Sequence, residues 1–418
     1  MDTEYYIKFV KHLVKKMIGR PDPLWPLFLF EQKVNPLTWE NRTSILAWAE
    51  DCLKKRIGYE ALELYAKSDD PIVRQGYELK QVIEQKFKNV LSDKQDVRIL
   101  IHVPDPIRSP AGYSLFKNFA EAFEFIGIPT RTFSWNDSTE QILSEFKPTI
   151  LLSSDYYTWL EKIDWDAIKK YRQNNKLKIG LTAGLAEYGN TSLLERLTWA
   201  KKHQVDFYYS YRDSDYVHTR KEYKPFFNAG YKILFLPFGA NILHYYPVPC
   251  IARDAAYTFL GSVNGAKLPR YIQYLSPITS KYPGIFDGPG WRKIKDFKFN
   301  RDRDRYLYAR SMVGLNIHLQ EQIDWACEVN ERTFMLAACG VPQVVDDAKL
   351  LPKLFSKNAL FITKNPKEYQ ECFEMILKDP KIGTERALVA QREVFERHTT
   401  FHRAQSFIKQ LTMQGLIR

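Results

Sequence analysis

From residue 96 onward, short apolar segments alternate with segments of helical periodicity, and this alternation constrains the fold more than any other feature of the chain. The first series runs from VRILIHVP through TILLSS and LKIGLTAG to KILFLP. A second series begins at AAYTFLGS and continues through VGLNIHL and PQVVDD to ALFITKN. Apolar strands separated by helices are typical of parallel sheets with crossover helices. We therefore predict an α/β fold with two doubly wound domains, one after the other along the chain.

The predicted domain boundaries follow the changes in this pattern. Residues 1–95 have helical periodicity throughout and are predicted to form an accessory helical domain. The first α/β domain is expected over residues 96–243 and the second over residues 244–399. Sheets of this kind bind ligands beyond the carboxyl ends of their strands, so the two domains are expected to face a ligand cleft.

The composition excludes several classes of protein. The five cysteines are scattered and show no paired spacing, which disfavours a disulfide framework or a zinc site and favours a reducing, cytoplasmic location. The first twenty residues interleave lysines with apolar residues, unlike a signal peptide, and no later run reaches the ~18 apolar residues of a membrane span. The sequence has neither a P-loop nor a Gly-x-Ser-x-Gly motif.

The net charge of +12 concerns the partners of the protein and not its fold. Nucleic acid, anionic lipid and phosphorylated substrates are all compatible with it. A helix over residues 5–18 would separate an apolar face from a basic one. The apolar face would hold Tyr6, Phe9, Val10, Leu13 and Met17, and the basic face Lys8, Lys11, Lys15 and Lys16. Such a helix either lies on an anionic membrane surface, peripheral to the inner face of the membrane, or packs on its own domain, as most amphipathic helices do.

A set of motifs, most of them in the second series, resembles a known family. In chain order they are LPFGAN, YYP, FLGS, VGLNIH, NERTFMLAACGVPQVVDD, LLPKLF and a His-x-x-x-x-Arg run from His398 to Arg403. Together they resemble glycosyltransferases with two facing Rossmann-like domains, the GT-B fold, and are most similar to the CgeB-like, spore-maturation branch of the group-1 transferases. The resemblance covers roughly residues 98–412, is strongest over 310–412 and does not include residues 1–95.

The resemblance implies a reaction as well as a fold. The first α/β domain would bind the acceptor and the second a UDP- or GDP-linked sugar donor, and residues 400–418 would form a helix that crosses back to the first domain. The sugar would move to an acceptor hydroxyl without a cofactor, and without a metal because no His/Asp cluster has ligand spacing. The acceptor would be a surface polysaccharide, a lipid-linked glycan, a protein or a modified base in phage DNA. A non-catalytic nucleotide-sugar-binding protein of the same fold is the alternative.

The family pattern places the donor diphosphate beside the segment CEVNERTFMLAACGVPQVVDD, residues 327–347. Asn330, Glu331 and Arg332 stand where a short helix begins, and a helix amino terminus supplies free N–H groups while an arginine adds forked, charged donors. We predict that this donor-binding triplet holds the diphosphate, chiefly through Asn330 and Arg332, and that Arg332 stabilises it as a leaving group. The alternative for Arg332 is a surface ion pair with Glu328 or Glu331.

Other donor-site candidates follow neighbouring strands of the second domain. Gly261 and Ser262 form a small-residue turn where backbone can approach phosphate, with Lys267 and Arg270 just beyond, although a strand-ending glycine is also common for steric reasons. Two further candidates are Asp346 or Asp347, to accept ribose or sugar hydroxyls, and DGPGW at 287–291, to cradle the base or ribose or to form a plain turn.

One departure from the family pattern concerns stereochemistry. Many retaining relatives carry two glutamates separated by seven residues, and here those places hold Cys327 and Met335. Retaining and inverting outcomes therefore both stay open.

An inverting mechanism would need a general base in the first domain, within hydrogen-bond reach of the acceptor hydroxyl. The candidates that follow strands are Asp105, Asp155 and Glu187, although loops commonly carry such polar residues. Asp105 is preferred because its segment, DPIRSPAGYS, also supplies Gly112 and Ser114 near the start of a predicted helix. The predicted catalytic residues are Asp105 and Glu187, together with Arg332 on the donor side.

Overall fold

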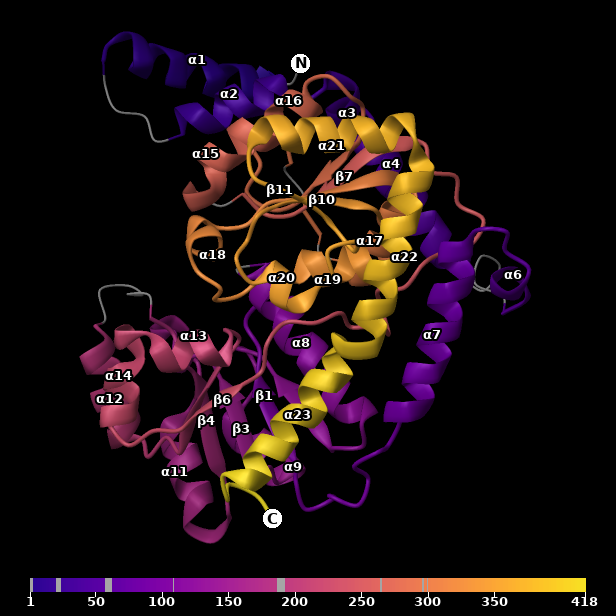
Figure 1. Cartoon of the computed structure of the whole chain (residues 1–418). Helices are drawn as coiled ribbons and strands as arrows, with labels where there is room; N and C mark the ends of the chain where they lie inside the picture. The colour runs from indigo at the N-terminus through magenta and orange to yellow at the C-terminus, as the bar shows by residue number, and fades with distance from the viewer. Residues whose placement is uncertain are drawn as a thin grey trace. The chain divides into compact units, whose positions relative to one another are not determined.

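The computed structural model describes residues 3–19, 24–56, 62–107, 109–185, 192–263, 265–294, 297–298 and 300–418. Two compact units divide the chain. Unit 1 combines Met1–Lys80 with Ile242–Glu396, and unit 2 combines Gln81–Asn241 with Arg397–Arg418. Each unit contains one parallel sheet accompanied by helices (Figure 1), so the predicted α/β class with two doubly wound sheets is confirmed.

The sheet of unit 2 has six parallel strands in the order β2-β1-β3-β4-β5-β6. Strands β1, β3 and β5 are buried along their whole length, which explains why they appear in the sequence as apolar runs without alternation. The strands are β1 Ile99–His102, β2 Thr130–Phe133, β3 Ile150–Ser153, β4 Lys178–Thr182, β5 Phe207–Ser210 and β6 Ile233–Phe235.

Several helices of unit 2 begin at side chains that satisfy the first free N–H groups of the helix. Asp164 accepts from the N–H groups of Asp166 and Ala167 at the start of α11, and Ser192 forms a capping box with Glu195 at the start of α12. The helices between the strands are α8 Pro110–Phe125, α9 Thr139–Phe146, α10 Tyr157–Leu160, α11 Trp165–Asn174, α12 Leu193–Lys202, α13 Ser214–Thr219 and α14 Lys224–Asn228, with the 3-10 turn Lys221–Tyr223.

The carboxyl-terminal helix, α23 (Thr400–Met413), belongs to unit 2. Phe401 of α23 stacks on Phe125 of α8 with their ring centroids 4.3 Å apart. Just before the helix, Thr399 forms an isolated β-bridge with Ala240. A side chain at Gly239 would overlap the backbone of this segment, so the close approach requires glycine there.

The sheet of unit 1 has five parallel strands in the order β11-β10-β9-β7-β8. The strands are β7 Ala255–Leu260, β8 Ile285–Asp287, β9 Ser311–Asn316, β10 Gln343–Asp346 and β11 Phe361–Thr363. The helices that follow them are α15 Leu268–Arg270, α16 Ser276–Thr279, α17 Arg301–Ala309, α18 Gln320–Asp324, α19 Glu331–Ala338, α20 Leu351–Leu354, α21 Pro366–Lys378 and α22 Pro380–Arg397, with a 3-10 turn at Gly265–Lys267 and a π-helical turn at Tyr271–Leu275.

The amino-terminal helices differ from the prediction of a separate domain over residues 1–95, because most of them form one compact unit with the second sheet. Phe30 of α2 lies in the core of unit 1, with its ring 6.0 Å from that of Phe286 on β8 and 5.3 Å from that of Trp291. A helix buries its apolar face against whatever apolar surface is near, and here that surface is the sheet. These helices are α1 Thr3–Met17, α2 Trp25–Lys33, α3 Pro36–Glu40, α4 Arg42–Lys54, α6 Leu62–Ala66 and α7 Pro71–Phe87.

Candidate functional site

The strand order of unit 1 marks one position along the sheet where a ligand is expected. The chain leaves β7 toward β8 on one side and later returns to β9 on the other, so the order reverses between β7 and β9. In open parallel sheets, ligands bind outside the carboxyl ends of the strands at such a switch point. The residues that follow these two strands, Gly261 and Ile317, therefore define the edge where a site should be found.

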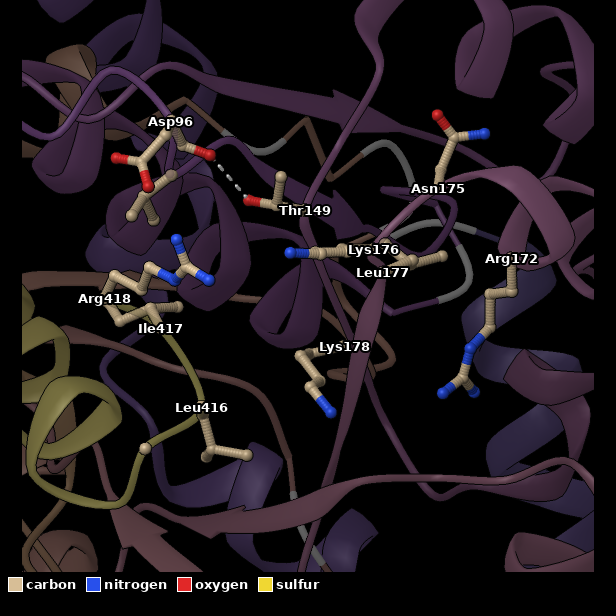
Figure 2. A pocket seen from close by; sticks show the side chains of 12 residues that line it. Asp96, Thr149, Arg172, Asn175, Lys176, Leu177, Lys178, Leu416, Ile417 and Arg418 are labelled. Atoms are coloured by element: carbon tan, nitrogen blue, oxygen red, sulfur yellow. Dashed lines mark hydrogen bonds between the residues drawn. The ribbon is translucent and has the colours of Figure 1, made fainter.

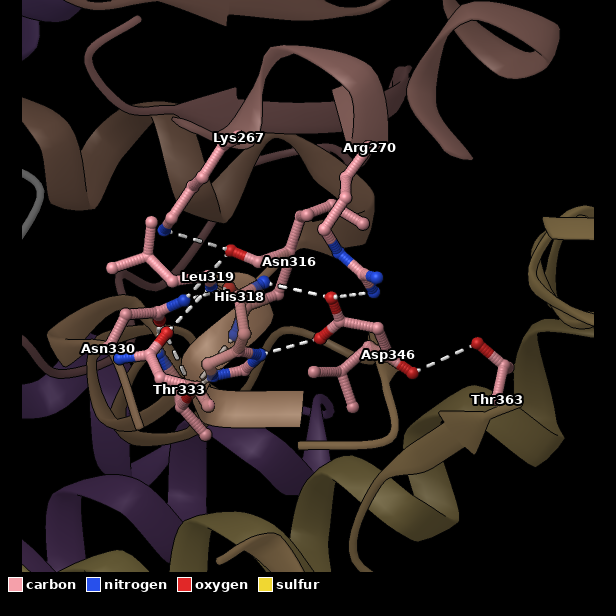
Figure 3. Close-up of polar contacts among 12 residues, drawn as sticks. Lys267, Arg270, Asn316, His318, Leu319, Asn330, Thr333, Asp346 and Thr363 are labelled. Atoms are coloured by element: carbon pink, nitrogen blue, oxygen red, sulfur yellow. Dashed lines mark hydrogen bonds and ion pairs between the residues drawn. The ribbon is translucent and has the colours of Figure 1, made fainter. Parts of the chain in front are cut away.

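Asp346 is the centre of a buried polar cluster at this edge (Figure 3). Its carboxylate accepts the backbone N–H of His318 at 2.9 Å and pairs with the His318 ring nitrogen Nδ1 at 2.6 Å. Arg270 donates to the same carboxylate from Nη2 at 2.8 Å. Asp346 was predicted to accept ribose or sugar hydroxyls, but its side chain is fully buried and both oxygens are occupied by protein groups. Its role in this arrangement is to position His318 and Arg270.

The protonation states of this cluster follow from burial and from the contacts. Burial alone would raise the pKa of Asp346, but the contacts from His318 and Arg270 outweigh it and hold that pKa below its usual value. Burial lowers the pKa of His318, so its ring is neutral. A neutral ring that donates from Nδ1 to Asp346 leaves Nε2 as an acceptor, 3.4 Å from the hydroxyl of Thr333. His318 was missed by the sequence analysis, although it closes the VGLNIH motif.

Asn330 caps α19 instead of pointing to an external ligand. Its side-chain oxygen accepts the backbone N–H of Thr333 at 3.2 Å. Its amide nitrogen donates to the side chain of Asn316 at 2.8 Å and to the backbone carbonyl of Ile317 at 3.1 Å (Figure 3). Because both amide hydrogens have internal acceptors, Asn330 has no side-chain N–H left for a diphosphate in this conformation. It fixes the amino terminus of α19 against the end of β9.

Arg332, one residue into α19, lies against the end of β7. Its Nε donates to the carbonyl of Leu260 at 2.9 Å, and its guanidinium lies 4.3 Å from the ring centroid of Phe259. The Nη1 atom is buried and has no hydrogen-bond partner among the described residues. A side chain at Gly261 would overlap the guanidinium, so this glycine leaves the space that Arg332 occupies. The ion pair with Glu328 or Glu331, considered as the alternative, is not what holds Arg332.

Lys267 adds a third positive charge at the same edge, beside Arg270 and Arg332. Its Nζ donates to the carbonyl of Ile317 at 3.2 Å. Burial, together with the nearby charge of Arg332, lowers the pKa of Lys267 to about 8. The cations thus come from the turns after β7 and from α19, and they surround the switch point between β7 and β9. Such a concentration of positive charge is suited to an anion.

The DGPGW segment packs directly on the turn after β7. The backbone N–H of Gly261 donates to the carbonyl of Asp287 at 2.8 Å, and Trp291 donates from Nε1 to the carbonyl of Gly261 at 2.8 Å. Gly288 has φ +146° and Gly290 has φ +87°, which are conformations that other residues rarely adopt. The segment is therefore a tight glycine turn that supports Gly261, whereas Ser262 beside it is exposed.

Two side chains from the amino-terminal helices hold this turn, and neither contact was predicted by the sequence analysis. Arg42 of α4 donates from Nη2 to the buried carboxylate of Asp287 at 2.8 Å, and Arg303 of α17 donates to its other oxygen at 3.1 Å. Glu31 of α2 accepts the backbone N–H of Arg292. Burial raises the pKa of Glu31 to about 7. The amino-terminal segment therefore contributes to the framework of the switch-point edge.

Glu331 stands at the first position of α19, where it is partly buried. Its negative charge raises the pKa values of the buried Tyr245 and Tyr308, although burial is the main cause for both.

The predicted general bases of unit 2 have different surroundings. Asp105 is partly exposed in the loop after β1, and its Oδ1 accepts the N–H of Ile107 at 2.8 Å, which shapes the turn before α8. Asp155 is buried, accepts from the hydroxyl of Thr182 at 2.9 Å and pairs with Arg196. Burial raises the pKa of Asp155 to about 6 despite that pairing. Asp155 thus ties β3 to β4 and α12. Glu187 lies outside the described residues.

The sequence analysis also missed His102, at the carboxyl end of β1. In the order β2-β1-β3, the switch point of unit 2 lies between β1 and β3, and His102 is there with its Nδ1 3.1 Å from the hydroxyl of Ser153. The ring is fully buried beside Phe133 and Trp159, and its Nε2 has no partner among the described residues. Burial lowers the pKa of His102 to about 3, so the ring is neutral.

A surface pocket of about 560 Å³ lies at the opposite, amino edge of the same sheet (Figure 2). It is lined by residues that precede or begin strands, such as Val97, Thr149 and Lys178. Two of its basic residues, Arg172 and Lys178, are paired with Asp206. We do not place the site there, because parallel sheets bind ligands at the carboxyl ends of their strands.

The comparisons with known proteins concern the carboxyl-terminal part and the fold. Residues 273–409 match a family model described as glycosyl transferase-like, whereas no curated protein matches the sequence. A variant of T4 phage β-glucosyltransferase in complex with UDP-glucose has a TM-score of 0.52 at 10% identity, over 76% of this chain and 99% of that chain. The T4 phage enzyme with UDP and Mn²⁺ gives 0.51 at 9% identity over the same shares. HepE from Anabaena in complex with UDP-glucose gives a TM-score of 0.48 at 12% identity, over 76% of this chain and 99% of that chain.

At such low identity the solved structures establish the fold alone, and that fold is GT-B, as predicted. The CgeB-like branch named in the sequence analysis is not confirmed, because the family match is to the broader description. The match over residues 273–409 includes β9, α19 and β10, which carry His318, Arg332 and Asp346. The family match and the GT-B fold together support a glycosyltransferase.

Proposed function

We propose that this chain is a glycosyltransferase that binds a nucleotide-sugar donor at the carboxyl edge of the unit 1 sheet and transfers the sugar to an acceptor hydroxyl. The observation that carries the proposal is the group of cations at the switch point, Lys267, Arg270 and Arg332, in which Nη1 of Arg332 is buried without a partner. A buried guanidinium nitrogen without a hydrogen-bond acceptor lowers the stability of the protein unless a ligand supplies that acceptor. A diphosphate is an anion whose oxygens have a suitable geometry.

The roles of these residues follow from what each already contacts. Arg332 and Lys267 would hold the diphosphate and stabilise the charge that develops on it as the sugar leaves. Arg270 is fixed by Asp346 and would act through position and charge. Gly261 and Ser262 would let backbone approach the phosphates. Asn330 and Glu331 would set the amino terminus of α19, whose first N–H groups lack intrahelical acceptors.

The donor is proposed to be UDP- or GDP-linked, and the UDP complexes of the T4 phage enzyme favour UDP as the first nucleotide to test. We propose a reaction without a metal, in which the basic residues do the work of charge stabilisation. The T4 phage enzyme has been solved with Mn²⁺ as well as UDP, so turnover should be compared with EDTA and with added Mn²⁺. Activity that is lost in EDTA and restored by Mn²⁺ would show that the metal is needed.

On the acceptor side we propose Asp105 as the general base, with Glu187 as the other candidate. Asp105 is partly exposed beyond the end of β1 in unit 2, whereas Asp155 is buried and forms an ion pair with Arg196. The acceptor is proposed to be a glycan or lipid-linked glycan of a surface polysaccharide pathway. A modified base of DNA is the second candidate, because the net charge of +12 favours a polyanionic partner.

The proposal is tested by turnover of the full chain with a panel of UDP- and GDP-sugars. Release of free nucleoside diphosphate that depends on an added acceptor is expected for a transferase. Tight binding of a nucleotide sugar without any release, with glycans, lipid-linked glycans and hydroxymethylated DNA each supplied, would instead indicate a non-catalytic binding protein of the same fold.

A further inference from the structure

Helix α1 presents an uncovered apolar stripe to solvent. Four large apolar side chains of α1 and a fifth, directly after its last residue, are exposed, with exposed fractions from 36% for Val10 to 77% for Met17. They are Ile7, Val10, Val14, Met17 and Ile18. Ile7, Val10, Val14 and Met17 are three or four residues apart, which places them on one side of the helix, and Ile18 follows Val14 by four. None of the helices in the described parts of the chain combines the length and apolarity needed to cross a bilayer, α1 included.

The opposite side of α1 is already used within unit 1. His12 lies with its ring centroid 4.6 Å from that of Phe28 on α2, and Leu13 is partly buried. The sequence analysis had grouped Leu13 with Val10 and Met17 in a single apolar face. In the structure, the part of that face that packs on the protein is separate from the stripe. Packing of α1 on its own domain therefore does not account for the exposed side chains.

Lysines are the only charged side chains along the stripe itself, because the one acidic residue of α1, Glu4, precedes the first stripe residue, Ile7. Residues 5–18 contain four lysines and no acidic residue. Lys11 follows Ile7 by four positions and Lys15 precedes Ile18 by three, so both lysines lie along one edge of the stripe, about 40–60° around the helix from these residues. Both lysines are exposed, as is Lys16, and they form no ion pair with any described residue. Lysines beside an apolar stripe can extend toward lipid phosphates while the stripe enters the interface.

We propose that α1 docks the protein on an anionic membrane surface, with the stripe in the headgroup boundary and Lys11 and Lys15 on lipid phosphates. A nucleic acid would complement the lysines but leave the apolar side chains in water. A second copy of the chain would cover the stripe but would bring the same lysines together. An anionic lipid surface complements both features at once. This inference does not depend on the proposed transferase activity.

The test is flotation of the full chain with vesicles of phosphatidylcholine alone or mixed with phosphatidylglycerol. Binding is expected only to the mixture, and raising the salt from about 0.1 M to about 1 M should weaken it, since the Debye length falls from about 10 Å to about 3 Å. Val14→Asp should lower partitioning at least roughly tenfold, because it removes an apolar side chain that would enter the headgroup boundary and adds a negative charge that anionic lipid repels. The matched control is Leu194→Asp, at a side chain that is 75% exposed on α12 and should have no effect.

A charge variant that keeps the stripe intact gives a second measurement if Val14→Asp disturbs α1. Lys11→Ala with Lys15→Ala should lower partitioning about 25-fold, at roughly fivefold for each lysine near an anionic surface. Equal binding to both kinds of vesicle, or unchanged binding by both variants, would overturn the proposal. A third outcome would also overturn it: the wild-type protein does not bind the vesicles but forms a dimer in solution, and Val14→Asp dissociates that dimer. The stripe would then be covered by a second copy of the chain. Retention of the wild-type protein on DNA but not on vesicles would also overturn it.

Discussion

At the scale of single residues, Arg332 and Arg386 make nearly the same contacts, but only Arg332 lies at the switch-point edge. Each guanidinium lies 4.3 Å from a phenylalanine ring centroid, Phe259 or Phe361, and each side chain donates to a backbone carbonyl next to that ring. We expect Arg332→Ala to weaken the binding of UDP or GDP by about 2 kcal/mol, roughly 30-fold, because a charge-assisted phosphate contact is lost. Isothermal titration measures the change.

The matched control for this prediction is Arg386→Ala, which should lose a comparable amount of stability and no nucleotide affinity. Nucleotide affinity that is the same in wild type and Arg332→Ala would remove Arg332 from the donor site.

Lys267 gives the site a pH dependence with a defined sign. Its pKa in the folded protein, about 8, lies below the ordinary lysine value of 10.5, so the charged form is lost as pH rises through about 8. Affinity for UDP should therefore fall roughly fourfold between about pH 7 and about pH 8.5, a range in which the terminal phosphate, with a second pKa of about 6, is already ionised. Titrations across this range test the prediction, and Lys267→Arg should flatten the profile because arginine stays charged. An equally steep profile in Lys267→Arg would assign the dependence to another group.

Asp105 is the acceptor-side residue whose role is most easily separated from folding. If it takes the proton of the acceptor hydroxyl, Asp105→Asn should lower kcat by a factor of about 100 or more and leave the affinity for UDP unchanged. A suitable control is Asp137→Asn, since Asp137 also lies in a loop after a strand of unit 2 and also accepts a backbone N–H, that of Ser134 at 2.6 Å. Full activity in Asp105→Asn would exclude this residue and leave Glu187 as the candidate to test.

The sequence predicted the position of site residues along the sheet better than it predicted their partners. A residue that follows a parallel strand must lie at the carboxyl edge, so Gly261, Arg270 and Asp346 are found there. Which atoms each one contacts depends on side chains from other strands and helices. Asp346 could therefore not be recognised as enclosed by His318 and Arg270, nor Asn330 as a helix cap with both amide hydrogens used.

At the scale of secondary-structure elements, the amino-terminal helices support the edge of the unit 1 sheet. Arg42 on α4 holds Asp287 at the end of β8, and Glu31 on α2 holds the backbone of Arg292. The turn between these contacts packs on Gly261, beside Arg332. A chain of contacts thus leads from α2 and α4 to the switch-point edge.

This support predicts a stability effect. Arg42→Ala should lower the free energy of unfolding by about 1.5–3 kcal/mol, because the buried carboxylate of Asp287 loses two charge-assisted hydrogen bonds. The control is Arg131→Ala, whose ion pair with Glu145 is about half exposed and should contribute at most about 1 kcal/mol. Urea unfolding of both variants gives the comparison. Equal losses in the two variants would mean that the contact from α4 adds nothing beyond a surface ion pair.

The elements themselves were largely predictable, and their long-range packing was not. Parallel strands buried on both faces leave apolar runs that are visible in the sequence, as VRILIHVP and VGLNIHL show. Helical periodicity likewise indicated the amino-terminal helices. It carries no information on what an apolar face packs against, and Arg42 and Asp287 are 245 positions apart. The prediction of a separate helical domain failed for that reason.

At the scale of the whole molecule, each unit is an open parallel sheet with one switch point, and the charged groups suited to a diphosphate gather at the switch point of unit 1. The resemblance to a transferase family predicted donor binding by the second α/β domain, and this stays a prediction, whereas the match over residues 273–409 is to a family described as glycosyl transferase-like. The acceptor cannot be deduced in the same way, because its contacts depend on loop side chains that follow no periodic pattern.

Hydrogen–deuterium exchange of the full chain, with and without saturating UDP or GDP, tests the central claim most directly. Nucleotide should slow exchange at the turn after β7, at the end of β9 and at the amino terminus of α19, which carry Lys267, His318 and Arg332. It should leave unchanged the amino edge of the unit 2 sheet around Thr149 and Lys178, where the surface pocket lies. Protection at that amino edge, or none at the three segments of unit 1 when the nucleotide is bound, would contradict the assignment of the donor site.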